Sequence, residues 1–136
     1  MNTGASETLS VVVERDLKYA PEKIWRALTQ PHLIEEWLMK NDFKPVLDER
    51  FTLHGDWGAV ECQVRTIEPH KTLSYTWAAY GLESIVTWTL TATSAGTRLR
   101  MEQTGFRPEQ QQAYRGAQNG WPQLFAALER VLAKTD

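Results

Sequence analysis

The last quarter of the chain places its apolar residues at helical spacing. Between Pro108 and Lys134 they recur at intervals of three, four and seven residues, which puts them on one face of an amphipathic helix. The residues on this face are Tyr114, Ala117, Trp121, Leu124, Leu128 and Val131, widened by Phe125 and Leu132. Gly120 and Pro122 interrupt the pattern, and proline removes a backbone hydrogen bond. We therefore expect either a kink near residues 118–121 or two helices that meet there.

Most of the preceding chain alternates apolar and polar residues, as strands do when one face of a sheet is buried. The predicted strands cover residues 9–18, 50–54, 59–67, 72–77, 83–93 and 97–104. The clearest alternation lies in 83–93, where Val86, Trp88 and Leu90 share one side and a row of threonines takes the other. Such a sheet needs a cover on one face only, and the long C-terminal helix supplies it.

Two short helices are expected directly after the first strand. Pro21 and Pro31 each suit a first helical position, because the N–H that proline lacks would be unpaired there anyway. Apolar residues follow both prolines at helical spacing, namely Ile24, Trp25 and Leu28, then Leu33, Ile34, Trp37 and Leu38. Residues 41–46 read as a loop that leads into a short strand. The sequence thus predicts a single α+β domain over residues 9–136, preceded by a frayed tail over residues 1–8.

Composition narrows the classes of function. The chain has 136 residues, of which 42% are hydrophobic, and a net charge of -2, so a core is expected and nucleic-acid binding is not. No apolar run approaches the roughly 20 residues that span a bilayer, and the N-terminus does not read as a secretory signal. The single cysteine, Cys62, has no partner for an intrachain disulfide, which favours a cytoplasmic location. On the strand pattern its side chain points inward as inert packing.

Six tryptophans in so short a chain are the unusual feature of the composition. Large aromatic side chains dominate both protein cores and binding cavities. The aromatic group expected between sheet and helix consists of Trp37, Tyr75, Trp77, Trp88, Met101 and Trp121. These residues either line a pocket for a flat or aliphatic ligand or fill the core at normal density. Gln103 shares the strand parity of Met101, so its amide either orients a ligand or bonds to backbone or water.

Acid–base or metal chemistry has little support in the sequence. The histidines His32, His54 and His70 lack the spacing of metal ligands, and a metal site needs three or four converging groups. His54 with Glu61 or Asp56 is either an acid–base pair across a turn or an exposed hairpin pair, and the second reading is favoured. We assign no catalytic residue, no metal site and no cofactor.

The order of several short segments carries a family resemblance over about residues 9–132. These segments are Ala20-Pro21, Ile24-Trp25, Leu28-Thr29, Pro31, Trp37, residues 73–77, residues 96–99, and Gly120-Trp121 with Leu124 and Leu128. In this order the chain resembles the START-like superfamily, also called SRPBCC or helix-grip. Within it, the chain is most similar to the branch related to the C-terminal domain of the activator of heat-shock-protein-90 ATPase.

The resemblance implies a curved antiparallel sheet wrapped around the last helix, with an apolar cavity between them. Relatives bind lipids, sterols, plant hormones or polyketides, some catalyse cyclisations, and the superfamily shares no catalytic triad or metal site. The first hypothesis is therefore binding of a small hydrophobic molecule in that cavity. Its expected contacts are Trp37, Tyr75, Trp77, Trp88, Met101, Gln103, Trp121 and Phe125.

Two further functions stay open at this point. One is a protein-interaction module that acts through its surface, like the chaperone-activator domain. The other is a cyclase-like or hydrolytic enzyme that uses the same cavity. Pairing of two copies through the first strand or through the outer threonine face is open as well, because exposed strand edges and faces can add a second chain.

Overall fold

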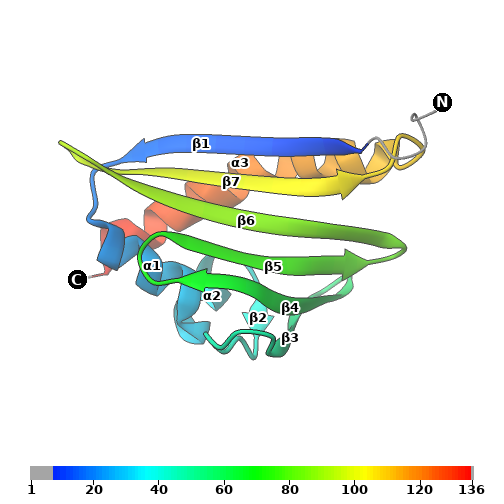
Figure 1. Cartoon of the computed structure of the whole chain (residues 1–136), viewed down its shortest axis with the longest axis horizontal. Helices are drawn as coiled ribbons and strands as arrows, with labels where there is room; N and C mark the ends of the chain where they lie inside the picture. The colour runs from blue at the N-terminus through cyan, green and yellow to red at the C-terminus, as the bar shows by residue number, and fades with distance from the viewer. Residues whose placement is uncertain (1–7, 136) are drawn as a thin grey trace.

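The computed structural model describes residues 8–135, so the expected tail lies outside the described residues except for Thr8. The elements in chain order are β1 (Leu9–Leu17), α1 (Pro21–Thr29), α2 (Pro31–Trp37), β2 (Lys40–Asn41), β3 (Arg50–Gly55), β4 (Gly58–Glu68), β5 (Thr72–Ala79), β6 (Leu82–Thr93), β7 (Gly96–Phe106) and α3 (Gln111–Lys134). The strands form one antiparallel sheet in the order β1-β7-β6-β5-β4-β3-β2. The longest helix, α3, lies behind β1 and β7 in Figure 1 and packs against both.

This arrangement confirms the fold class predicted from the sequence. The fold is α+β, with a curved antiparallel sheet, two short helices after the first strand and one long C-terminal helix, as in helix-grip proteins. Each of the six predicted strands begins and ends within two residues of its expected bounds. The short strand expected after the loop at 41–46 instead precedes it, as β2.

The two short helices form a hairpin held by prolines and a buried indole. Pro21 and Pro31 each begin a helix, as the missing N–H of proline favours. Trp37 at the end of α2 donates from Nε1 to the carbonyl oxygen of Ala27 in α1 at 2.8 Å. In the first turn of α1, Lys23 donates from Nζ to the Thr135 carbonyl oxygen at 2.6 Å. The hairpin is thereby joined to the C-terminal end of α3.

Of the two outcomes expected near residues 118–121, the meeting of two helices is wrong, because α3 is one continuous helix with Pro122 inside it. Proline there removes one hydrogen bond within the helix. The apolar side chains nearest to it and beyond it are nevertheless packed: Trp121, Phe125 and Leu128 are each at most 3% exposed. Since helices in proteins are held mainly by tertiary packing of such a face, the neighbouring turns keep the helix intact. The helix also begins at Gln111, three residues later than the expected start at Pro108.

The inner face of the sheet forms the core and the outer face carries the threonines. In β6, Val86, Trp88 and Leu90 are buried, whereas Thr87 and Thr89 are partly exposed. Cys62 in β4 points inward, as predicted, and burial raises the pKa of its thiol above the ordinary value. No helix among residues 8–135 is long and apolar enough to cross a membrane.

Candidate functional site

Trp88 lies at the centre of the aromatic group between sheet and helix. Its ring is fully buried. It meets the Trp37 ring edge to face at a centroid distance of 5.7 Å, the Trp121 ring at 5.7 Å and the Phe125 ring at 5.6 Å. Edge-to-face and tilted pairs at these distances are favourable beyond the area they bury. This part of the aromatic group fills the core.

Tyr75 supplies the polar partner of the buried Trp88 indole. Trp88 donates from Nε1 to the Tyr75 hydroxyl oxygen at 3.0 Å. Burial raises the pKa of Tyr75 above its usual value, and the Trp88 hydrogen bond opposes this shift only in part. The hydroxyl therefore stays protonated and serves as a structural group.

A second hydrogen-bonded chain joins the helix to three strands. Trp121 in α3 donates from Nε1 to Gln103 Oε1 at 2.7 Å, and Gln103 Nε2 donates to Ser84 Oγ at 3.0 Å. Ser84 Oγ in turn donates to the carbonyl oxygen of Trp77 at 2.9 Å. Gln103 is only 2% exposed, so its amide is a buried polar group whose partners are protein atoms. The inward orientation predicted for Gln103 is confirmed.

A cleft of about 220 Å³ opens between the sheet and the N-terminal half of α3. Trp77 and Leu82 line it from the sheet, Met39 lines it from the segment after α2, and Ala113 and Ala117 line it from the helix. In the C-terminal half of α3, Phe125 packs against the Trp88 ring of β6, and Leu128, Val131 and Leu132 are buried. Ala117 and Leu124, both on the predicted apolar face, line the cleft and are only partly buried.

The structure divides the predicted site residues into two groups. Trp77, Gln103 and Trp121 line the cleft. Beneath them, packed into the core, are Trp37, Tyr75, Trp88, Met101 and Phe125, each at most 5% exposed. The two groups adjoin each other, because the Trp121 ring of the cleft lies 5.7 Å from the Trp88 ring of the core.

Sequence reasoning missed the glycines in the helical wall of the cleft. Gly116 and Gly120 lie one turn apart on α3 and both line the cleft. Glycine inside a helix costs about 1 kcal/mol relative to alanine. A Cβ atom at either position would meet no atom within 4 Å, so packing does not require glycine there. The sequence did contain a signal for these glycines. A glycine inside a helical pattern that does not cap the helix needs another explanation, either packing or function.

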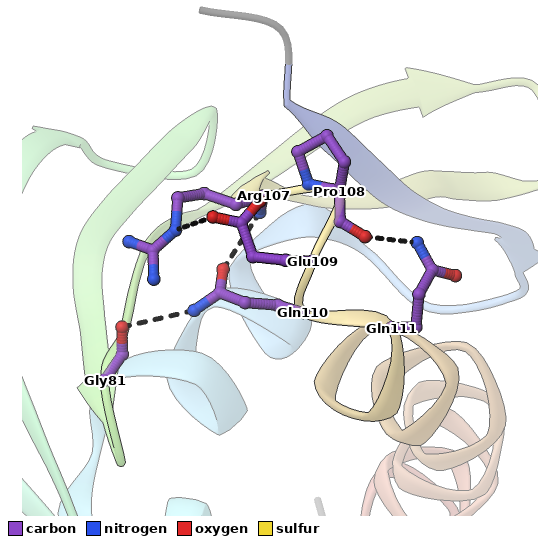
Figure 2. Close-up of polar contacts among 6 residues, drawn as sticks. All are labelled: Gly81, Arg107, Pro108, Glu109, Gln110 and Gln111. Atoms are coloured by element: carbon purple, nitrogen blue, oxygen red, sulfur yellow. Dashed lines mark hydrogen bonds and ion pairs between the residues drawn. The ribbon is translucent and has the colours of Figure 1, made fainter. Parts of the chain in front are cut away.

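The Gln110 side chain holds the start of α3 against the sheet wall of the cleft (Figure 2). Its Oε1 accepts from the Arg107 backbone N–H at 2.9 Å, and its Nε2 donates to the Gly81 carbonyl oxygen at 3.2 Å. Arg107 also pairs with Glu109 at 3.2 Å. Because Gly81 directly precedes Leu82, a residue of the cleft, the bond from Gln110 to Gly81 links the start of α3 to the sheet wall.

A larger hollow of about 430 Å³ lies on the outer face of the sheet. Thr76, Ile85 and Thr104, from three neighbouring strands, are among the residues that line it. Apart from Thr8, which precedes β1, all of its lining residues belong to β5, β6 and β7 of this one sheet. A ligand there would have no helix facing it. The cleft under α3, with walls on both sides, is the better candidate because binding sites enclose most of their ligand.

The side chains that line the cleft are apolar, apart from the amide of Gln103 and the indole N–H groups. Among the described residues that line it, none carries an ionisable side chain. No group of three or more histidine, cysteine, aspartate or glutamate side chains in residues 8–135 is placed to hold a metal ion. The walls offer two indole rings, one phenyl ring, aliphatic surface and one amide.

Replacing Gln103 by leucine should lower the free energy of unfolding by about 2 kcal/mol. The substitution leaves the buried Trp121 indole N–H without an acceptor, and unmet buried donors cost about this much. Urea unfolding followed by circular dichroism measures the change. The matched control is Gln112→Leu on the exposed face of α3, where a change within about 0.5 kcal/mol is expected. Equal effects in both variants would contradict a structural role for the buried amide.

A family model described as Activator of Hsp90 ATPase homolog 1-like protein matches residues 18–133. The chain belongs to this family. The match confirms the START-like, SRPBCC resemblance identified in the sequence. No curated protein matches the chain.

Solved structures of similar proteins agree with this assignment. Protein MLL2253 from Mesorhizobium loti is 59% identical, with a TM-score of 0.91 over 94% of this chain and 99% of that one. The Aha1 dimer from Colwellia psychrerythraea is 17% identical, with a TM-score of 0.82 over 91% and 96%. DynU16, from the dynemicin biosynthetic locus, is 24% identical, with a TM-score of 0.82 over 92% of this chain and 47% of its own. The last two share the fold of this chain.

Proposed function

We propose that the protein binds a small hydrophobic molecule in the cleft between the sheet and the N-terminal half of α3. The observation that carries this proposal is the incomplete burial of the apolar face of α3 over a space of about 220 Å³. Protein interiors are normally close-packed, and the C-terminal half of α3 is packed in this way. The absence of ionisable groups among the residues lining the cleft favours an uncharged ligand and gives acid–base catalysis no group to use there.

Native mass spectrometry of freshly purified protein tests the proposal. We expect an extra mass on the folded protein that disappears on denaturation. In the variant Ala117→Phe, a phenyl ring from the helical wall fills the cleft, and the extra mass should be absent. Ala126→Phe places the same ring on the exposed face of α3 and should keep it.

Tryptophan fluorescence provides a second readout of the same proposal, because Trp77 and Trp121 line the cleft. Titration with a panel of aromatic and aliphatic compounds should change the emission of the parent protein and of Ala126→Phe. Binding by Ala117→Phe should be at least about tenfold weaker, which is the scale of a lost apolar pocket. An unbound mass in all three proteins together with unchanged fluorescence across the panel would contradict the proposal.

A further inference from the structure

The size of the cleft limits the ligand. A dry apolar cavity of about 150 Å³ accepts benzene, and pockets for drug-sized ligands begin at about 300 Å³. The cleft, at about 220 Å³, lies between these values. A pair of fused six-membered rings fits this range, whereas a sterol or a long acyl chain exceeds it.

The walls of the cleft suit a flat molecule. The Trp77 and Trp121 rings lie 5.5 Å apart at an interplanar angle of 55° and supply aromatic surface. On α3, Gly116 and Gly120 leave the helix backbone bare where alanine would fit without a clash and would favour the helix. A position that weakens local structure without any packing reason points to function. Here the missing methyl groups allow a ring to approach the helix closely.

Gln103 adds one polar contact to these apolar walls. Its amide nitrogen carries two hydrogens. Of the hydrogen bonds among the described residues, it donates one, to Ser84. Because Gln103 lines the cleft and is 2% exposed, the second N–H is a donor that water reaches poorly. A ligand oxygen that accepts this hydrogen would be favoured over a purely hydrocarbon ligand.

We propose that the cleft selects a bicyclic aromatic molecule with one hydroxyl or carbonyl oxygen, and that Gly116 and Gly120 set this selectivity. The inference rests on the function proposed above and makes it specific. Gly116 and Gly120 admit the ring, and Gln103 recognises the oxygen.

The test is titration of the purified protein with 1-naphthol, naphthalene and decanoic acid, followed by tryptophan fluorescence and calorimetry. We expect 1-naphthol to bind about tenfold more tightly than naphthalene, as one additional hydrogen bond would give. Decanoic acid should bind at least tenfold more weakly than 1-naphthol, because its chain is long and its carboxylate would meet no cation in the cleft.

The variants Gly116→Ala and Gly120→Ala address the two glycines. Each should weaken 1-naphthol binding about tenfold while raising Tm by about 3 °C through better helix propensity. Asn119→Ala, at an exposed position of the same helix, should leave 1-naphthol binding unchanged. A gain in Tm with a loss of binding is a combination that a merely structural role for the glycines would not produce.

The outcomes separate this inference from the proposal beneath it. Binding of decanoic acid but not of 1-naphthol would overturn the aromatic selectivity and leave hydrophobic binding standing. Equal affinity for naphthalene and 1-naphthol would overturn the role of Gln103. Unchanged 1-naphthol binding in both glycine variants would overturn the role of the glycines. Absence of binding by every compound, with no copurified mass, would remove both proposals.

Discussion

The variant Trp88→Ala is expected to lose about 4 kcal/mol or more of its free energy of unfolding. Removing a fully buried indole leaves a cavity among the rings of Trp37, Trp121 and Phe125. It also takes the hydrogen-bond donor away from the buried Tyr75 hydroxyl. Domains of this size are stable by only about 5–15 kcal/mol, so the loss is a large share of the total. Urea unfolding followed by far-ultraviolet circular dichroism measures it.

Two further variants make this result interpretable. Trp88→Phe keeps an aromatic ring in the core but not the indole N–H, so a smaller loss of about 2 kcal/mol is expected. Trp57→Ala removes a tryptophan that is 53% exposed, and about 1 kcal/mol or less should be lost. If Trp88→Ala were as stable as Trp57→Ala, the Trp88 ring would not be the centre of the core.

We expect stability and the proposed ligand binding to depend on different parts of the interface between α3 and the sheet. In the C-terminal half of α3, Leu128 and Leu132 are fully buried, and side chains there contribute to folding. In the N-terminal half, the wall contains Gly116 and Gly120 and the space beneath it is open. Substitutions near Trp88 should therefore change stability first, whereas substitutions at the glycines should change binding first.

The fold could be predicted because its elements are encoded locally. Alternation along residues 83–93 and three-to-four spacing after Tyr114 each report which side chains face the core. Pro21 and Pro31 mark the helix starts for the same local reason. Pro122 does not divide the helix, which was one of the two expected outcomes, because packing that the sequence does not display holds the turns on both sides together.

The cleft could not be predicted from the same signals. A strand pattern shows that Trp77 and Trp88 share the inner face, but not which ring borders open space. That difference depends on how far α3 stands from the sheet, and the spacing is fixed by contacts between distant segments. One of these contacts is the hydrogen bond from Gln110 to the carbonyl oxygen of Gly81, in the turn between β5 and β6. The sequence shows that Gly116 and Gly120 lie within a helix, but only the structure shows that open space lies beside them.

The variant Gly96→Ala should lose more than about 3 kcal/mol of its free energy of unfolding, because two penalties add. Gly96 begins β7 with a φ of 156°, a conformation that side chains rarely adopt. A Cβ atom there would also overlap the carbonyl oxygen of Leu17, a backbone atom that cannot rotate away. Relief requires β1 and β7 to separate at this end, where Thr97 Oγ1 donates to the Tyr19 carbonyl oxygen at 2.7 Å.

Gly81→Ala separates the two penalties that act at Gly96. Gly81 also has a positive φ, of 83°, but no atom lies within 4 Å of the position its Cβ would take. It should therefore lose only about 1–2 kcal/mol, the cost of the backbone conformation alone. Urea denaturation of both variants gives the difference, which measures the close approach of the β6–β7 turn to the end of β1. Equal losses would show that the end of β1 moves aside freely, and that this contact does not hold the first strand and the following helical hairpin in place.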